Sequence, residues 1–370
     1  MKPKRVLQIP GVLLEGGVEN VIMNWYRRID RNAIQFDFLV SRNFKGPLDD
    51  EITSLGGRII YAPTIREKGL GYISCVANII KRNGPYDVVH IHSAHMGVFS
   101  VLSCKIAKVK KIIYHVHSTQ NLTLRDNPFK ILIEKTSRLL INKFSNVKYA
   151  CSEEAGKFVF GSSDFIVVNN AVDLAVFYPY NNDKIQLLRE MYSIPKGSII
   201  VGNVSRFVKG KNQDFLIRII SEDKNNGGRL FLVLVGDGVT KRKVEELAEE
   251  LNCKDRVLFM GARNDTPNFY NIFDVFVLPS DFEGLSLVTV EAQACGIPCV
   301  ISYGVPDEVD MGVTSVKKCD LKDPYNIWNK EIYSVSKDRV SDSTFIENKI
   351  CKKGYCLDAI MKQIEQQYEI

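Results

Sequence analysis

Two glutamates stand eight residues apart in the stretch "SDFEGLSLVTVEAQACGIP", where Glu283 precedes an expected helix and Glu291 lies inside it. A strand-like run comes first, Ser286 can cap the helix, and Gly296 can end it. The free backbone N–H groups at a helix N-terminus attract phosphate. The pair therefore predicts a site in which two carboxylates flank a bound phosphate.

Cations that suit such a ligand follow a strand-like run in "NVSRFVKGKNQDF". Arginine offers a planar fork and lysine a mobile point charge, a suitable combination for a diphosphate. We favour Arg206 and Lys211 over Lys209, although spacing alone hardly separates the two lysines. A solvated surface loop is the alternative interpretation.

Glycine turns follow other strand-like runs. Gly16 and Gly17 stand just before an expected helix, where they allow a ligand to approach the backbone. Gly236 opens a similar Gly-Asp-Gly turn in the second half. Neither turn is a dinucleotide fingerprint or a P-loop, and tight turns with nothing bound are the alternative.

All five histidines lie between positions 90 and 117. Strand alternation puts His90 and His92 on one face, and His115 and His117 on one face of a neighbouring strand. Histidines in this pattern can bind a metal, but no acidic or cysteine ligand lies close to them in sequence. We expect one functional histidine at a strand end, His117 first and His92 second, with the others packed.

Positive charge is concentrated in the first half of the chain. Residues 1–172 carry 24 Lys+Arg against 14 Asp+Glu, and the remainder carries 25 against 29. Within 105–148 the count is ten against two, and part of that segment has the pattern of a basic amphipathic helix. Nucleic acid, anionic lipid and a phosphate-bearing substrate are candidate partners, and a solvated basic face is the alternative. In the helix, Lys130, Lys135 and Arg138 are expected to point away from the apolar face.

The totals limit the class of protein. The 370 residues are enough for two domains, and no run of about 18 apolar residues predicts a membrane span. The start reads as a strand and loop, not as a signal peptide. The nine cysteines include no CxxC pair, which favours reduced thiols in a cytoplasm and disfavours a cysteine zinc site.

Short β-branched runs alternate with amphipathic stretches in both halves, the pattern of α/β proteins with parallel sheets. We predict two Rossmann-like domains, 1–172 and 173–350, that face each other across a cleft. The segment 351–370 is expected to be a helix that packs back on the first domain. Eleven runs are predicted as strands: "RVLQIP", "FDFLVS", "RIIYAP", "DVVHIHS", "KIIYHVHS", "VKYACS", "SIIVGNVSRF", "LFLVLVGDG", "VLFMG", "VFVLPS" and "PCVIS".

Together these motifs resemble the family 4 nucleotide-sugar glycosyltransferases, which have the GT-B fold. The resemblance extends from "GGVENVIMNWYR" through "HVHST", "VVNNAVDLAVF", "VSRFVKGKNQDFL" and "LVGDG" to "EGLSLVTVEAQACGIPCV". Its most specific part is a pair of glutamates separated by seven residues, here Glu283 and Glu291. Two departures stand out: Ala171 replaces a usual glycine, and Asn212 follows Lys211 where glycine is usual.

The resemblance implies roles for the candidate residues. Glu291 would hold the donor ribose, and Glu283 and His117 would be catalytic near the transferred sugar. The remaining donor-binding residues would be Gly16, Gly17, Arg206, Lys211, Gly236, Leu287 and Val288. No metal or cofactor is expected, because two cations and a helix dipole can stabilise the leaving diphosphate.

The resemblance is strongest to bacterial enzymes that build capsule or exopolysaccharide. It implies a retaining enzyme that moves a hexose or N-acetylhexosamine from a nucleotide sugar, expected to be UDP-linked, to a lipid-linked saccharide. The expected location is cytoplasmic, at an anionic membrane surface on the inner face of the cell membrane. The alternatives are a GT-B sugar-nucleotide epimerase, a histidine-metal hydrolase and a non-enzymatic binder of anionic polymers; no nucleic-acid motif supports the last.

Overall fold

The computed structural model describes residues 2–14, 16–117 and 128–369, which form two compact units. Unit 1 contains residues 1–170 together with 357–370, and unit 2 contains residues 171–356. The chain thus passes from unit 1 to unit 2 and returns for its last helix. Each unit is described by itself.

Unit 1 is built on a seven-stranded parallel sheet with the strand order β3-β2-β1-β4-β5-β6-β7. Its central strands are buried on both faces, which is why they read as nearly continuous apolar runs. The strands are β1 Lys4–Gly11, β2 Ile34–Val40, β3 Arg58–Tyr61, β4 Val88–His92, β5 Lys111–Val116, β6 Val147–Ala150 and β7 Ile166–Val167.

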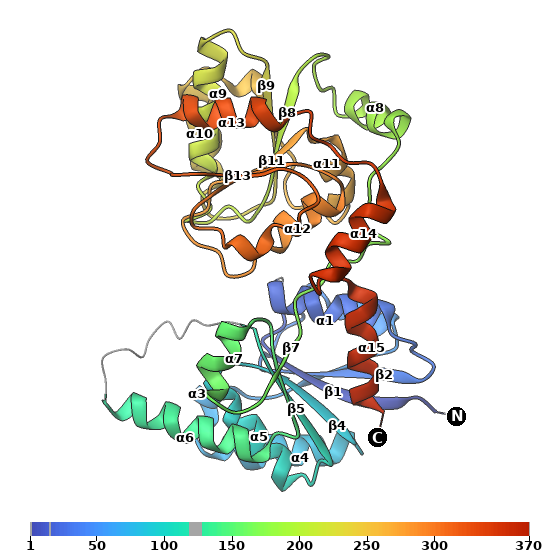
Figure 1. Ribbon diagram of the computed structural model, residues 1–370. Helices are drawn as coiled ribbons and strands as arrows, with labels where there is room; N and C mark the ends of the chain where they lie inside the picture. Colours follow the sequence, from blue (N-terminus) through green and yellow to red (C-terminus); the bar gives the residue numbers. More distant parts are fainter. Residues whose placement is uncertain (1, 15, 118–127, 370) are drawn as a thin grey trace. The chain divides into compact units, whose positions relative to one another are not determined.

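Helices cover this sheet, and α15 joins them from the C-terminal end of the chain (Figure 1). Helix α15 lies against α1, and its Tyr368 is fully buried. The helices of unit 1 are α1 Gly17–Arg28, α2 Asp49–Ser54, α3 Ile65–Lys68, α4 Gly71–Asn83, η1 His95–Gly97, α5 Val98–Ile106, α6 Pro128–Phe144, α7 Glu153–Phe160 and α15 Leu357–Tyr368.

Unit 2 has a six-stranded parallel sheet with the order β10-β9-β8-β11-β12-β13, which is the Rossmann order 3-2-1-4-5-6. Its strands are β8 Ile199–Val204, β9 Leu230–Val235, β10 Val257–Phe259, β11 Val275–Leu278, β12 Cys299–Ser302 and β13 Val316–Cys319. Its helices are α8 Asn182–Met191, α9 Gln213–Asn225, α10 Lys241–Glu250, η2 Lys254–Arg256, α11 Thr266–Ile272, α12 Leu287–Ala294, η3 Asp307–Val309, α13 Tyr325–Val335 and α14 Ser343–Lys352.

Both sheets reverse their strand order at one point, between β1 and β4 in unit 1 and between β8 and β11 in unit 2. Ligands of open α/β sheets bind at the carboxyl ends of the strands beside such a switch point. The loops after β8 and β11 carry Arg206, Lys211 and Glu283, and His117 follows β5. The fold therefore places most of the candidate residues at the expected edges of the two sheets.

All eleven predicted strands are present, and two further strands were missed. Strand β7 has only two residues, and β13 reads "VKKC" at a sheet edge, where lysine commonly discourages further pairing. The predicted orientation of Arg138 on α6 was wrong: it is half-buried, and its guanidinium donates to the carbonyl of Phe158. The expectation for Lys130 falls outside the described side chains. None of the helices in the described ranges is long and apolar enough to span a membrane.

Candidate functional site

A polar cluster of unit 2 joins the loops that follow β8 and β11. Lys211 Nζ donates to Glu283 Oε1 at 2.5 Å, and the Ser280 hydroxyl donates to the same oxygen at 2.6 Å. The side chains of Lys211 and Glu283 are only 23% and 12% exposed. The pair is thus partly shielded from water, and a short ion pair there is stronger than a fully exposed one.

Asn212 explains one departure from the family pattern. Its backbone is left-handed, with a φ of +53°, a conformation that glycine adopts freely and asparagine tolerates better than most residues. Its side-chain amide donates to the Pro279 carbonyl at 2.9 Å and to Asp281 Oδ1 at 2.6 Å. Asparagine therefore keeps the turn and also ties the β8 loop to the β11 loop.

Arg206 and Lys209 are both exposed. Within the described part of the chain, neither forms an ion pair, so both charges remain available to a ligand. Gln213 lies beneath this loop, and its amide donates to the Arg206 carbonyl at 2.9 Å. The loop backbone is thus anchored, whereas the Arg206 guanidinium is free to reach an anion.

Gly236 has a packing role that does not depend on any ligand. Its φ is +140°, and an added Cβ would lie 2.0 Å from the Ser205 carbonyl oxygen. The β9 loop therefore passes directly over the β8 loop. Any larger residue would displace the segment that carries Arg206.

The start of α12 differs from the expected cap. Ser286 occupies the N-cap position, but its hydroxyl pairs with that of Thr289 at 2.9 Å and caps no backbone amide. The Leu287 amide donates to the Leu285 carbonyl at 3.1 Å. The Val288 amide has no protein acceptor among the described residues, so it remains available to an anion. At the other end, the chain leaves α12 at Gly296 with a φ of +74°, as predicted.

Glu291 lies in the second turn of α12 and accepts a 2.7 Å hydrogen bond from the Tyr270 hydroxyl. Burial raises the pKa of Glu291 to about 7, and the Tyr270 bond offsets only part of this shift. A carboxylate in this position gains further hydrogen-bond donors when a ligand supplies hydroxyl groups. The site thus suits a polyhydroxyl ligand such as ribose.

Glu291 should make the folded protein lose stability as the pH rises. Its folded pKa of about 7 lies above the ordinary 4.5, so its contribution is full below pH 4.5 and is lost as the pH rises through 7. Relative to Glu291→Gln, the wild type should lose about 1–3 kcal/mol of unfolding free energy over this range. Denaturant unfolding of both proteins at several pH values would measure it. Because the buried histidines are common to both, their titration cancels; a pH-independent difference would contradict the assignment.

Gly16 and Gly17 lie where α1 begins in unit 1. Gly16 is the N-cap residue, and Gly17 is exposed with open space around it. The Glu19 carboxylate lies over Gly16, because an added Cβ there would be 2.5 Å from Glu19 Oε2. This carboxylate must move before an anion can reach the first amides of α1.

His117 directly follows β5 and contacts His92 of β4. His92 and His117 stack with ring centroids 5.2 Å apart, and a 2.9 Å hydrogen bond joins His92 Nδ1 to His117 Nε2. Burial lowers the pKa of His117 to about 4, although the neighbouring Asn170 side chain raises it. His117 is therefore neutral at physiological pH.

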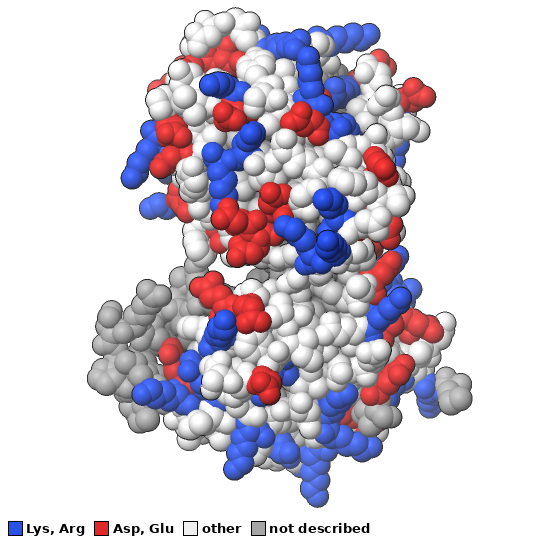
Figure 2. Space-filling model, in the orientation of Figure 1, with Lys and Arg blue, Asp and Glu red and all other residues white. Residues whose placement is uncertain are grey.

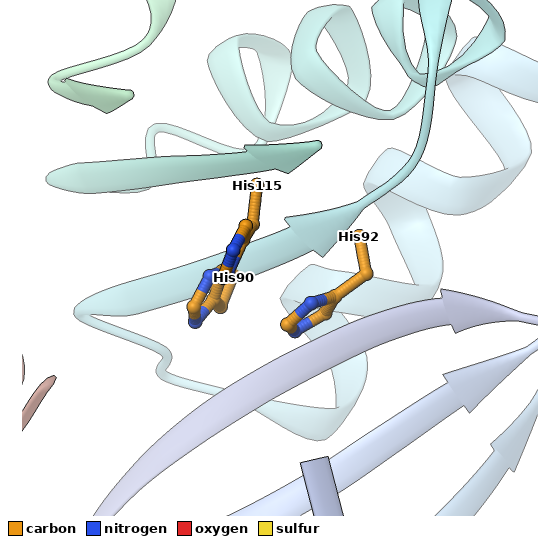
Figure 3. Close-up of side chains that lie close together, drawn as sticks. All are labelled: His90, His92 and His115. Atoms are coloured by element: carbon orange, nitrogen blue, oxygen red, sulfur yellow. The ribbon is translucent and has the colours of Figure 1, made fainter. Parts of the chain in front are cut away.

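His90, His92 and His115 form a buried group whose ligand atoms lie within 4.8 Å of one another (Figure 3). A metal ion must lie in the plane of each imidazole that binds it. The rings of His90 and His115 are stacked at 11°, and both nitrogens of His92 are already hydrogen-bonded. Trp25 stacks on His90 and His115. This geometry suits packed neutral rings better than metal ligands.

Several residues of the site were missed at the sequence level. Ser280 and Tyr270 contact the two glutamates, and Gln8 and Tyr368 contact the histidines. Ser280 follows β11 directly, so its place at a strand end was a usable signal. The other three lie in ordinary-looking strands or helices, and no local pattern distinguishes them.

The chain matches two family models, "Glycosyltransferase Family 4" over residues 15–176 and "Glycosyl transferases group 1" over residues 184–348. EpsF of Bacillus subtilis (strain 168), a protein named as a glycosyltransferase, is 35% identical over 95% of this chain and 93% of its own length. The chain belongs to glycosyltransferase family 4. This confirms the family that the motifs indicated, and the protein is a glycosyltransferase.

More distant relatives agree with this membership. A UDP-Gal:alpha-D-GlcNAc-diphosphoundecaprenol alpha-1,3-galactosyltransferase of Escherichia coli is 28% identical over 78% of this chain and 76% of its own. Among solved structures, Anabaena HepE in complex with UDP aligns with a TM-score of 0.76 at 20% identity, covering 99% of both chains. A Rickettsia africae glycosyltransferase aligns with a TM-score of 0.77 at 16% identity, over 100% of this chain and 98% of its own. The two Rossmann-like domains of the GT-B fold are thereby confirmed.

Proposed function

We propose that this family 4 glycosyltransferase moves a hexose or N-acetylhexosamine from a UDP-sugar to a lipid-linked saccharide, with retention of configuration, in exopolysaccharide or capsule biosynthesis. Unit 2 binds the donor and unit 1 the acceptor. The observation that carries the proposal is the cluster at the unit 2 switch point. There, a glutamate from the family signature lies against a lysine, and an arginine that forms no ion pair with the described residues stands on the same loop as the lysine.

The relatives support the donor and acceptor classes. The Escherichia coli relative is named for a UDP-sugar donor and a diphosphoundecaprenol acceptor, and HepE was solved with UDP and glucose. Glu291 would accept from the ribose hydroxyls, and the Val288 amide would meet the diphosphate together with the Leu287 amide once that amide leaves the Leu285 carbonyl. A positive helix end and two cations suit such a group.

The leaving group is a nucleoside diphosphate, so the step that needs help is the build-up of negative charge on it. Arg206 and Lys211 supply compensating positive charge, and the reaction needs no metal in this proposal. Lys211 is held by Glu283 before a donor arrives, so it is already oriented. Glu283 and His117 act at the transferred sugar, and attack takes place on the face that the diphosphate leaves.

A thermal-shift screen with UDP, GDP, ADP and TDP, each alone and as a sugar conjugate, tests the donor class. A ligand at about one hundred times its Kd should stabilise the protein by about 3 kcal/mol. Stabilisation by UDP compounds alone supports the proposal. Stabilisation by a nucleotide with another base would mean that the donor carries that base in place of uracil. The absence of any shift would contradict it. Recovery of an altered nucleotide sugar without an acceptor product would favour the epimerase.

The basic half is proposed to meet an anionic membrane surface, where a lipid-linked acceptor would lie. Lysine and arginine side chains gather along the rim of unit 1 that carries α4 (Figure 2). Near the packed ends of α5 and α6, Lys105 and Lys143 are exposed, as are the apolar Ile106 (50%) and Leu139 (70%). Exposed apolar side chains on the same two helices as exposed lysines suit a lipid headgroup region.

Flotation with vesicles tests this membrane proposal. The full chain should float with phosphatidylglycerol vesicles at low salt and should not float with phosphatidylcholine vesicles. Leu139→Glu should weaken flotation by several-fold, because it adds a negative charge and removes an apolar contact. Absence of binding to anionic vesicles at low salt would contradict the proposal.

A further inference from the structure

Three hydrogen bonds in unit 1 connect the last helix of the chain to His117, and a fourth joins that helix to His90. Tyr368 Oη lies 2.8 Å from His90 Nδ1 and 3.0 Å from Gln8 Nε2. Gln8 Oε1 lies 2.8 Å from His92 Nε2, and His92 Nδ1 lies 2.9 Å from His117 Nε2. These residues come from α15, β1, β4 and the end of β5, so they meet only through the fold.

The chemistry of each group determines which atom donates and which accepts in this chain of hydrogen bonds. With the Gln8 amide oriented as in the structure, its nitrogen donates to Tyr368 and its oxygen can only accept, so His92 Nε2 must carry the hydrogen. A neutral imidazole has a single N–H, so His92 Nδ1 accepts from His117 Nε2. The hydrogen of His117 therefore lies on Nε2, and its Nδ1 keeps a lone pair.

Water does not compete with this arrangement. Gln8, His90 and Tyr368 are fully buried, and His92 is 4% exposed. Burial lowers the pKa of His90 and His92 well below the usual range, so both stay neutral. Hydrogen bonds that are shielded in this way hold their geometry better than those exposed to solvent.

The Nδ1 atom of His117 takes no part in this chain of hydrogen bonds. It is buried and within the described ranges completes no hydrogen bond of good geometry, but the Asn170 side chain lies beside the ring and raises its pKa, so this side chain competes with a ligand for Nδ1. A buried lone pair without a donor is costly, so a ligand hydroxyl that donates to it gains binding energy. The ring thus presents an acceptor, not a donor, to whatever enters beside it.

We propose that Tyr368, Gln8 and His92 are positioning residues that hold His117 in its Nε2–H tautomer, so that Nδ1 accepts a hydrogen bond from a hydroxyl of the transferred sugar. This inference rests on the proposed function for the role of the sugar, but the tautomer itself does not depend on it. The last helix of the chain thereby has a role in the site of the first domain. A purely structural stack of histidines would not require one tautomer.

Nitrogen NMR of the full chain, labelled with ¹⁵N-histidine, tests the tautomer in the absence of any ligand. The resonances of His117 are identified by their loss in His117→Gln. The wild type should show the Nε2–H form, and Tyr368→Phe should show a mixture, because the Gln8 amide is then free to reverse. The Nδ1–H form or a mixture in the wild type would overturn the inference.

Kinetics tests whether the tautomer matters. Tyr368→Phe should lower kcat about tenfold with little change in the donor KM, as expected for the loss of one hydrogen bond that acts on an oriented group. Gln8→Leu interrupts the hydrogen-bond chain at a second point and should lower kcat by a similar factor. His95→Gln changes a buried histidine that takes no part in these hydrogen bonds, and it serves as the control. Thermal unfolding measures whether each variant is folded. An unchanged kcat in both folded variants would overturn the positioning role; failure of the wild type to bind any nucleotide sugar would instead contradict the proposed function.

Discussion

Glu283→Gln should lower kcat about ten- to a hundredfold while the affinity for the nucleoside diphosphate stays nearly unchanged. The wild-type carboxylate accepts from Lys211 and Ser280 through one oxygen, and in the proposed mechanism it acts at the transferred sugar. A lost hydrogen bond to a charged group costs about 1.5–3 kcal/mol, which corresponds to that range of rates. Glutamine keeps the shape and the acceptor oxygen of the side chain, so a decrease in kcat would result from the missing negative charge. Initial rates at saturating donor would measure kcat, and calorimetry with UDP would measure affinity.

Asp281→Asn is the matched control for this experiment. Asp281 lies on the same loop two residues earlier and is exposed, and its carboxylate contacts Asn212 and no cation in the described structure. The same change from carboxylate to amide there should leave kcat within about twofold, as is usual for an exposed surface position. Equal losses in both variants would mean that the charge of the loop, not Glu283 itself, matters.

The fold was largely predictable because burial on both faces of a parallel sheet leaves a strong local signal. Eleven strands appear as apolar runs, whereas the two-residue β7 and the lysine-bearing β13 give no such signal. In the sequence, Asn212 differs from the family pattern, but nothing there indicates its left-handed backbone. Its conformational reason required the backbone angles.

The contacts within the site were not predictable, because they depend on strand order. Lys211 and Glu283 lie 72 residues apart and meet since β8 is the neighbour of β11. Tyr368 and Gln8 lie 360 residues apart and meet because α15 returns to unit 1. The expected Ser286 cap failed for a local reason, since the hydroxyl of Thr289 competes for the same side chain.

Glu291→Ala should weaken donor binding about ten- to a hundredfold and leave kcat at saturating donor nearly unchanged. In the proposed complex, the carboxylate accepts from ribose hydroxyls far from the reacting bond, so its contribution is equal in the ground state and the transition state. Loss of a charged hydrogen-bond acceptor costs about 1.5–3 kcal/mol, and this should appear in Kd and KM. Calorimetry with UDP and rates over a range of donor concentrations would separate the two effects.

Tyr270→Phe provides the comparison that separates the carboxylate from its surroundings. The hydroxyl of Tyr270 donates to Glu291 Oε2, and its removal leaves the carboxylate present but less well oriented and less readily ionised. We expect an affinity loss of a few-fold, which is smaller than that of Glu291→Ala. The two glutamates should therefore show opposite patterns, with the Glu283 variant altered in kcat and the Glu291 variant in KM. A Glu291→Ala enzyme that bound UDP as tightly as the wild type would contradict the assignment, since no other described carboxylate on α12 could replace it.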